Sequence, residues 1–141
     1  MNTDRMNPAI LIFAGTTEGR KLAEYASLYS IKCYVSVATD YGKSLIEHLE
    51  NITILTGRMD EKEMEHFIEE NDIRLVIDAT HPFAREVTEN IRSACEKART
   101  HSEKVFYVRC VRPFENRSSD EQIIYTESVQ EAVEYLKKTT G

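Results

Sequence analysis

The stretch that decides the fold reads AILIFAGTTEGR and occupies residues 9–20. Its first six residues are all apolar, which is typical of a strand buried on both faces of a parallel sheet. A glycine-bearing turn follows, and residues 17–29 then carry apolar side chains near helical spacing. Strand, turn and helix in this order predict the first unit of an α/β fold.

The same alternation continues along the chain. Strands are predicted at residues 32–38, 52–55, 74–77, 105–108 and 123–125, and helices at residues 42–49, 60–71, 82–99 and 128–138. Asp60 and Glu63 form the capping-box pattern at the start of one helix. Right-handed crossovers place helices on both faces, so we predict a doubly wound, Rossmann-like parallel sheet in three αβα layers. The 141 residues fit one domain, and residues 1–8 are expected to form a loose leader.

Composition narrows the function classes. The formal net charge of −6 argues against non-specific nucleic-acid binding, which needs a basic face. No signal peptide is visible and no apolar run approaches the ~20 residues that span a bilayer, so we expect a cytoplasmic protein without membrane partners. Cys33, Cys95 and Cys110 show no CxxC spacing, which favours buried, reduced thiols and no metal site.

The turn that follows the first strand is a candidate phosphate-binding site. Backbone N–H groups at the start of a helix favour an anion, and the helix dipole adds to this. The usual GxGxxG slots would be Ala14, Thr16 and Gly19, so threonine hydroxyls would replace part of the backbone contact. The residues predicted to hold the cofactor here are Gly15, Thr16, Thr17, Gly19 and Arg20. A tight turn with an N-capping threonine is the alternative.

The end of the second predicted strand bears on cofactor choice. Asp40 lies about 20 residues past the first turn, where an acid commonly holds a ribose 2′-OH, and this would favour NADH. A 2′-phosphate would instead prefer Ser36, Thr39 or Lys43. The alternative for Asp40 is a simple turn with Gly42.

Residues 78–84, DATHPFA, form the strongest candidate site. They follow an apolar strand, and ligands bind at the carboxyl ends of strands in open parallel sheets. His81 could donate a proton or hydrogen-bond a carboxylate, and Pro82 can start the next helix. Arg58, Arg109 and Arg112 follow other strand ends and suit an anionic ligand. The alternative for Arg58 is a loop with a capping Asp, and the alternative for Arg109 and Arg112 is a solvated face.

Five motifs together resemble the precorrin-6A reductase family of cobalamin biosynthesis. They are ILIFAGTTEGR (10–20), SVAT (36–39), GRMD (57–60), DATHPFA (78–84) and Arg112-Pro113, and they span nearly all of the chain. The resemblance implies an oxidoreductase that uses NADPH to reduce a double bond of the precorrin-6A macrocycle, with or without cobalt. It also implies that the turn at 15–20 cradles the cofactor, with Ser36 and Thr39 nearby.

The resemblance further assigns roles at the substrate. Thr80 and His81 would lie near the reacting ring as catalytic residues. The macrocycle carries many carboxylates, so its candidate clamps are Arg58, Arg85, Arg109 and Arg112. Asp78 is a further candidate substrate contact. Members of the family usually have two α/β lobes, and this chain resembles the N-terminal one. A second lobe or subunit is therefore expected to complete the site.

Two other functions compete with the reductase. A free-standing Rossmann-like module that binds a nucleotide or ligand without chemistry is the first alternative. A short-chain or epimerase-like oxidoreductase is the second, but that class relies on a Tyr-x-x-x-Lys pair. No tyrosine of this chain has a lysine four residues later.

Overall fold

The structure is a computed structural model that describes residues 9–110. Its strands are β1 (Ala9–Ala14), β2 (Cys33–Val37), β3 (Ile52–Thr56), β4 (Ile73–Ala79), β5 (Arg99–Thr100), β6 (Glu103–Lys104) and β7 (Phe106–Arg109). Its helices are α2 (Thr17–Leu28), α3 (Asp40–Ile46), α4 (Glu61–Glu70) and α5 (Arg85–Lys97). Within the described range, the predicted strands lie within one or two residues of those observed.

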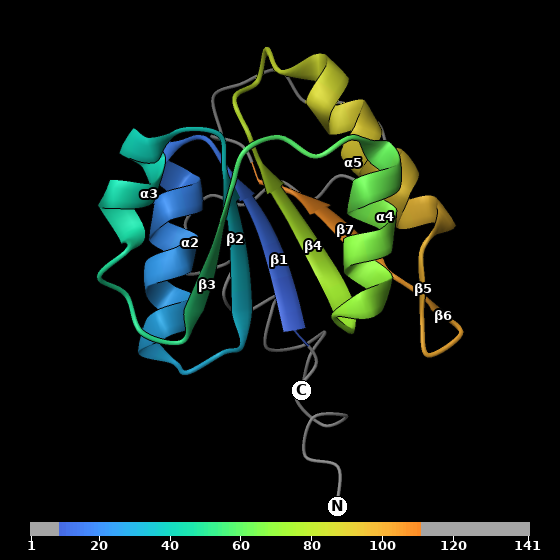
Figure 1. Cartoon of the computed structure of the whole chain (residues 1–141), viewed down its shortest axis with the longest axis horizontal. Helices are drawn as coiled ribbons and strands as arrows, with labels where there is room; N and C mark the ends of the chain where they lie inside the picture. Colours follow the sequence, from blue (N-terminus) through green and yellow to red (C-terminus); the bar gives the residue numbers. More distant parts are fainter. Residues whose placement is uncertain (1–8, 111–141) are drawn as a thin grey trace, which may run out of the picture.

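The main sheet has the strand order β3-β2-β1-β4-β7, and every neighbouring pair is parallel (Figure 1). The order reverses beside β1, because β2 lies on one side of it and β4 on the other. The carboxyl ends of these strands share one edge of the sheet, at the top of Figure 1. Ligands of doubly wound sheets bind at such an edge, where the strand order reverses.

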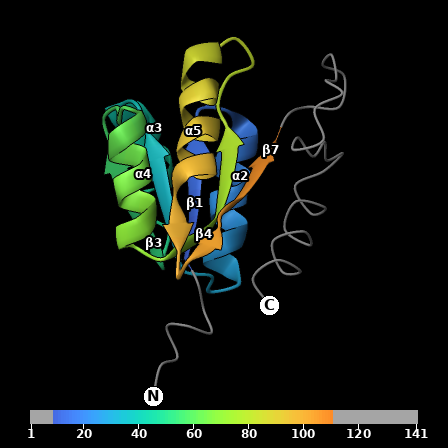
Figure 2. The same cartoon turned by 90° about the vertical axis from the view of Figure 1, so that its right-hand side faces the viewer.

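Each face of the sheet carries its own apolar core. On one face, Ile10 and Ile12 of β1 pack with Leu22 and Ala26 of α2. On the other face, residues such as Leu11 and Phe13 pack with side chains of α4 and α5. Alternate residues of one strand therefore serve opposite layers (Figures 1 and 2). This confirms the predicted three-layer, Rossmann-like fold.

Side-chain caps start three of the helices. Thr16 caps α2 by accepting from the Gly19 amide, and Thr39 caps α3 by accepting from the Gly42 amide. Asp60 and Glu63 form the predicted capping box at α4, and each of its two hydrogen bonds is 2.8 Å long. Because Thr39 is the cap, α3 begins at Asp40 and ends at Ile46. The predicted range 42–49 is therefore wrong, since it begins and ends too late along the chain.

The prediction that Pro82 starts a helix is also wrong. The His81 carbonyl accepts from the Ala84 amide at 2.9 Å, which closes a four-residue turn. Pro82 occupies the second position of this turn, which suits its fixed φ. Helix α5 therefore begins only at Arg85.

The short hairpin of β5 and β6 was not predicted. Its two-residue loop consists of His101 and Ser102, which both have positive φ, at 53° and 65°. Such loops usually contain Gly or Asn, so the sequence carries no hairpin signal here.

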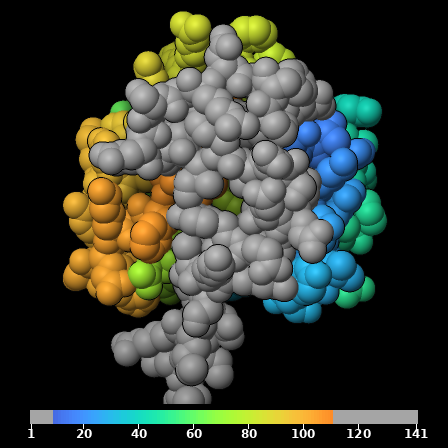
Figure 3. Space-filling model, turned by 180° about the vertical axis from the view of Figure 1, so that it is seen from behind, coloured from blue at the N-terminus to red at the C-terminus, as the bar shows by residue number. Residues whose placement is uncertain are grey.

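In the view from behind, the segment around β7 (orange) and helix α2 (blue) lie on opposite sides of the molecule (Figure 3). The strand predicted at 123–125 and the helix at 128–138 lie outside the described residues.

The three cysteines form no disulfide within residues 9–110, and all three are buried, as predicted. Burial raises the pKa of Cys33 and of Cys95 to about 12, so both thiols stay protonated at neutral pH. Among residues 9–110, no helix is long and apolar enough to cross a membrane. The same part of the chain holds no cluster of three or more potential metal-binding side chains.

Candidate functional site

Two turns meet at the carboxyl edge of the sheet, one after β1 and one after β4. A Cβ placed on Gly15 would lie 3.5 Å from the Thr80 Cα and 3.7 Å from the His81 amide nitrogen. The Thr16 hydroxyl donates to the Ala79 carbonyl at 2.9 Å. The predicted cofactor turn and the predicted catalytic turn are therefore joined directly.

The only hydrogen of the Thr16 hydroxyl is donated inside the protein. Besides donating to Ala79, it accepts from the Gly19 amide at 3.3 Å and so caps α2. This is the N-cap arrangement that the sequence left open as an alternative. An anion at this turn would therefore rely on the amide groups at the start of α2 and on the helix dipole.

Gly19 serves the packing of α2 against the sheet. A Cβ at Gly19 would lie 2.9 Å from the Ala14 Cα and 3.2 Å from the Ala79 Cβ. Any larger residue would push the helix away from β1 and β4. Gly19 is buried and does not line the neighbouring cavity, so the structure gives it the role of the third glycine in dinucleotide motifs.

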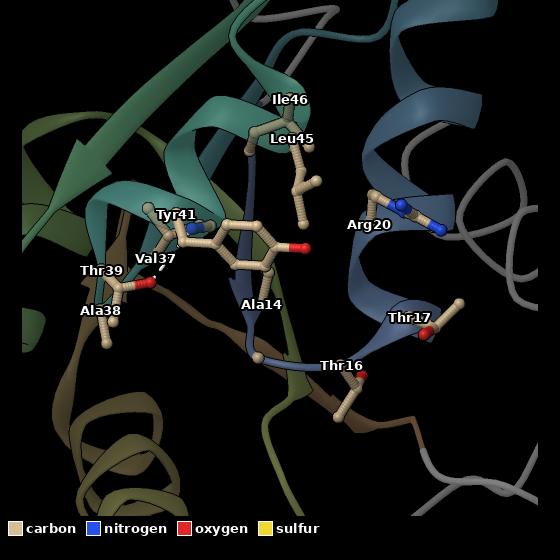
Figure 4. A pocket seen from close by; sticks show the side chains of 12 residues that line it. Ala14, Thr16, Thr17, Arg20, Val37, Ala38, Thr39, Tyr41, Leu45 and Ile46 are labelled. Atoms are coloured by element: carbon tan, nitrogen blue, oxygen red, sulfur yellow. Dashed lines mark hydrogen bonds between the residues drawn. The ribbon is translucent and has the colours of Figure 1, made fainter.

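A cavity of about 540 Å³ opens at the ends of β1 and β2, between α2 and α3 (Figure 4). Five of the residues predicted to hold the cofactor line it: Gly15, Thr16, Thr17, Arg20 and Thr39. Its remaining lining residues are Ala14, Val37, Ala38, Tyr41, Gly42, Leu45 and Ile46. Its size falls in the usual range for small-molecule and cofactor sites.

The cavity combines an apolar wall with one cation. Val37, Leu45 and Ile46 supply apolar surface, while Arg20 of α2 and Tyr41 of α3 come from opposite sides (Figure 4). The Arg20 Nε has no hydrogen-bond partner within residues 9–110, and its nearest ion-pair contact, Glu24, lies 3.9 Å away. No carboxylate is among the lining residues in the described part of the chain. This donor set suits a phosphate-bearing nucleotide.

Two residues predicted for cofactor choice lie away from the cavity. Ser36 is buried and alternates with Val35 and Val37, which pack on the α2 side of the sheet. The Ser36 side chain therefore faces the opposite layer. Asp40 is the exposed first residue of α3 and does not line the cavity.

The carboxylate of Asp78 is the centre of a buried polar network. Its Oδ1 accepts from the Thr80 amide at 3.0 Å, the Thr80 hydroxyl at 2.6 Å and the Arg109 Nη1 at 2.9 Å. Its Oδ2 accepts from the Thr88 hydroxyl at 2.8 Å and the Tyr107 hydroxyl at 3.0 Å. Five donors from the turn after β4, from α5 and from β7 thus satisfy one carboxylate.

This network changes what Asp78 and Arg109 can do. Asp78 is completely buried and the Arg109 side chain is only 9% exposed, because the two residues are register partners on β4 and β7. Both were predicted to contact the substrate, but this geometry favours a supporting role behind the site. Burial and the Asp78 charge raise the pKa of Tyr107 above its ordinary value, which keeps its hydroxyl protonated as a donor.

His81 presents a hydrogen-bond donor at the exposed surface. Its Nδ1 accepts from the Phe83 amide at 3.2 Å. A backbone amide can only donate, so the neutral imidazole carries its proton on Nε2. The neighbouring Phe83 is 82% exposed, and its ring centroid lies 5.3 Å from that of His81. An imidazole N–H and an aromatic face therefore stand together at the edge of the sheet.

The predicted arginine clamps divide into three groups. Arg58, in the loop after β3, and Arg85, the first residue of α5, are both exposed at the carboxyl edge. Arg109 is buried against Asp78. Arg112 lies outside the described residues.

Sequence reasoning missed Tyr41, Thr88 and Tyr107. Tyr41 is the second residue of α3, after the Thr39 cap and Asp40, and placing the helix start correctly would have brought it to the cavity. Tyr107 and Thr88 contact Asp78 across 29 and 10 residues of chain. Only the pairing of β4 with β7 and the position of α5 bring them together.

Comparison with known proteins identifies the family of the chain. The chain matches the precorrin-6x reductase (CbiJ/CobK) family over residues 9–141. It is 31% identical over 130 residues to the cobalt-precorrin-6A reductase of Salmonella typhimurium, covering 92% of this chain and 47% of the relative. It is 32% identical over 133 residues to the cobalt-precorrin-6A reductase of Methanocaldococcus jannaschii, covering 92% of this chain and 49% of the relative. The chain thus spans about half the length of these relatives.

Solved structures agree on the fold. A CobK precorrin-6A reductase superimposes with a TM-score of 0.55 at 18% identity, covering 94% of this chain and 75% of that one. A yeast methylglyoxal/isovaleraldehyde reductase complexed with NADPH superimposes with a TM-score of 0.55 at 13% identity, covering 74% of this chain and 37% of that one. These structural similarities establish the fold, and the match to the family model establishes the family. The chain belongs to the precorrin-6x reductase family.

Proposed function

We propose that this chain is the cofactor-binding lobe of an NADPH-dependent reductase. The enzyme reduces a double bond in the macrocycle of precorrin-6A or cobalt-precorrin-6A. The observation that carries the proposal is the cavity between α2 and α3, which five of the predicted cofactor residues line. It lies beside the switch point of a sheet whose family acts on this substrate class.

The cavity residues support binding of a phosphorylated nucleotide. The first turn of α2 offers amide groups and a positive dipole to a pyrophosphate. Arg20 gives the cavity a cation and Tyr41 gives it an aromatic face, while Asp40 lies outside it. An acid that could hold a free ribose 2′-OH is therefore missing from the described lining, which favours NADPH over NADH.

The second turn supports a role at the substrate. When bound, the nicotinamide supplies hydride, so the protein mainly orients two partners. His81 donates a hydrogen bond from Nε2 to the macrocycle and Phe83 offers it an aromatic surface. Arg58 and Arg85 hold its carboxylates. A second lobe or subunit closes the site, in keeping with the length of the relatives.

Calorimetric titration with NADPH and with NADH tests the cofactor site. We expect NADPH to bind more tightly. Ala38→Trp, at an exposed position on the cavity wall, should abolish binding by filling the cavity. Leu28→Trp is the matched control, because Leu28 is 73% exposed at the far end of α2. Equal binding by wild type and Ala38→Trp would overturn the assignment of the cavity.

A second candidate function is a nucleotide-binding module without chemistry of its own. The cavity lining favours it, because it contains no residue of the His81 turn and so does not depend on that turn to hold a nucleotide. Incubation with NADPH and cobalt-precorrin-6A separates the two candidates. NADPH oxidation that depends on the macrocycle supports the reductase. Tight NADPH binding without oxidation, when a second lobe is also supplied, supports the module.

A further inference from the structure

We infer that Asp78 and Thr80 are positioning residues that fix the His81 turn and do not themselves touch the substrate. The inference rests on the proposed function, since it concerns how that function's candidate donor is held. It revises the predicted roles of Asp78 in substrate binding and of Thr80 in catalysis. The observation behind it is that the two oxygens of the Asp78 carboxylate accept hydrogen bonds from different sets of residues.

Oδ1 of Asp78 serves the chain that leads into the site. It accepts from both the amide and the hydroxyl of Thr80, at 3.0 and 2.6 Å, so it fixes the backbone and the side chain of that residue together. Arg109 reinforces this anchor, because its Nη1 contacts Asp78 Oδ1 at 2.9 Å and the Thr80 hydroxyl at 3.1 Å. The Thr80 hydroxyl thus hydrogen-bonds both Asp78 and Arg109, so its polar contacts are made within the protein.

Oδ2 of Asp78 serves the surrounding framework. It accepts from Thr88 on α5 and from Tyr107 on β7, and neither residue belongs to the turn. The Thr80 and Thr88 hydroxyls also lie 3.4 Å apart, which is longer than any of the five hydrogen bonds to the carboxylate, so the two halves can be perturbed largely separately. Loss of an Oδ2 partner weakens the framework, whereas loss of the Thr80 contacts releases the turn.

Two other contacts reach the root of the His81 turn, namely the Thr16 hydroxyl bond to the Ala79 carbonyl and the close approach of Gly15, but neither is a hydrogen bond to Thr80 itself. His81 follows Thr80 directly, is exposed and belongs to neither apolar core cluster. Its carbonyl accepts from the Ala84 amide and its Nδ1 accepts from the Phe83 amide. Fixing the Thr80 backbone keeps these two bonds formed and the Nε2–H pointing in one direction. Such preorganisation matters when a donor must meet a bound ring.

The cost of burying this network supports a positioning role. Replacing a buried ion pair by apolar residues of similar volume is often neutral or stabilising. Stability alone would therefore not require a carboxylate with five donors behind an exposed turn. An accurate orientation of the Thr80 backbone does require it, since only an acceptor at this point satisfies both Thr80 donors.

A matched pair of variants tests the inference on the whole chain. Thr80→Val and Thr88→Val make the same change at two partly buried threonines that bond the two oxygens of Asp78. The readout is the nitrogen NMR spectrum of the His81 ring. Its signals are assigned by comparison with His81→Gln, whose spectrum lacks them. It reports whether Nδ1 stays unprotonated and hydrogen-bonded. Urea unfolding is measured in parallel for each variant.

We expect Thr80→Val to move the His81 ring signals toward the tautomer average of a free imidazole. Thr88→Val should lower stability and leave these signals unchanged, and Thr80→Ser, which keeps the hydroxyl, should restore them. If Thr80→Val does not fold, Thr80→Ala is measured in its place. Unchanged His81 signals in the Thr80 variant, or equal changes in both valine variants, would overturn the inference.

The outcome is separable from that of the proposed function. Failure of the wild-type chain to bind NADPH would overturn the cofactor proposal. The NMR measurement on His81 would still test whether the Asp78–Thr80 contacts fix the turn. In the active reductase, Thr80→Val should lower kcat on the order of 10-fold or more and leave the KM for NADPH unchanged. A rise in KM with unchanged kcat would contradict the positioning role.

Discussion

The turns after β1 and β4 lie side by side at one edge of the sheet but are built in different ways. The first turn is held by close packing. Gly19 lets α2 approach Ala14 so closely that a side chain at position 19 would clash with it. The second is held by polar contacts, because five donors converge on Asp78. One turn borders an open cavity, while the other presents an exposed imidazole.

The difference shows how one edge can serve two partners. Packing leaves the amide groups of α2 available to a ligand, as a phosphate site needs. A polar network fixes a side chain that projects into solvent, as a donor to a ring needs. The Thr16 hydroxyl, bonded to Ala79 at 2.9 Å, keeps the two turns in register with each other.

Removing the Asp78 carboxylate should give the largest effect on stability. Asp78→Ala leaves the Arg109 charge buried without its partner, and we expect a loss of about 3–5 kcal/mol in the free energy of unfolding. Urea denaturation measures it. Asp78→Asn is the control and should cost less, because its carbonyl can serve Thr80 and Arg109 while its amide donates to hydroxyls. A loss below about 1 kcal/mol for Asp78→Ala would mean that the network contributes no more than a surface ion pair.

Adding one methyl group at Gly19 should give the next largest effect. The new Cβ would lie 2.9 Å from the Ala14 Cα, so α2 must shift, and overpacking of this kind costs about 1–3 kcal/mol. Gly15→Ala is the matched control in the same turn, because its Cβ would meet nothing closer than 3.5 Å. Thermal unfolding of both variants sharpens the comparison. Equal stability of the two would show that packing does not hold the first turn.

Breaking the link between the turns should have a smaller effect. Thr16→Val removes the cap of α2 and leaves the Ala79 carbonyl without its hydroxyl partner, and losing a cap costs about 1 kcal/mol. Thr39→Val removes an exposed cap that has no second described partner, so it should cost less. Hydrogen exchange at the first turn of α2 and at the His81 turn would report the coupling. Faster exchange in α2 alone would show that the turns are independent.

Changing His81 should leave stability almost untouched. An exposed side chain away from the core changes the free energy of unfolding by no more than about 0.5 kcal/mol. His81→Ala should nevertheless lower turnover in the active reductase, with NADPH affinity unchanged. His66→Ala, at an exposed histidine of α4, is the control and should affect neither property. Normal turnover in His81→Ala would remove His81 from the proposed site.

The fold was largely predictable because its signals are local. Apolar runs marked the buried strands, and the Asp60–Glu63 capping box marked the start of α4. The errors also have local causes, since Pro82 suits a turn as well as a helix start. The loop of His101 and Ser102 adopts positive φ without glycine, which gives no warning in the sequence.

The site was predictable only in part because its chemistry depends on long-range pairing. The cofactor turn is one continuous stretch, and most of its predicted residues reach the cavity. The partners of Asp78 come from three separate segments, and Arg109 meets it only because β4 pairs with β7 in that register. A buried acid and an exposed ligand contact look alike in the sequence.

The most direct test of the cofactor site is NMR titration of the nitrogen-labelled chain with NADPH. The cavity assignment predicts that amide signals of Gly15, Thr16, Thr17 and Thr39 shift first, because these residues line the space between α2 and α3. Signals of the β5–β6 hairpin, from Arg99 to Lys104, should stay in place. Shifts that spare the β1–α2 turn and appear elsewhere in the described sheet would contradict the assignment.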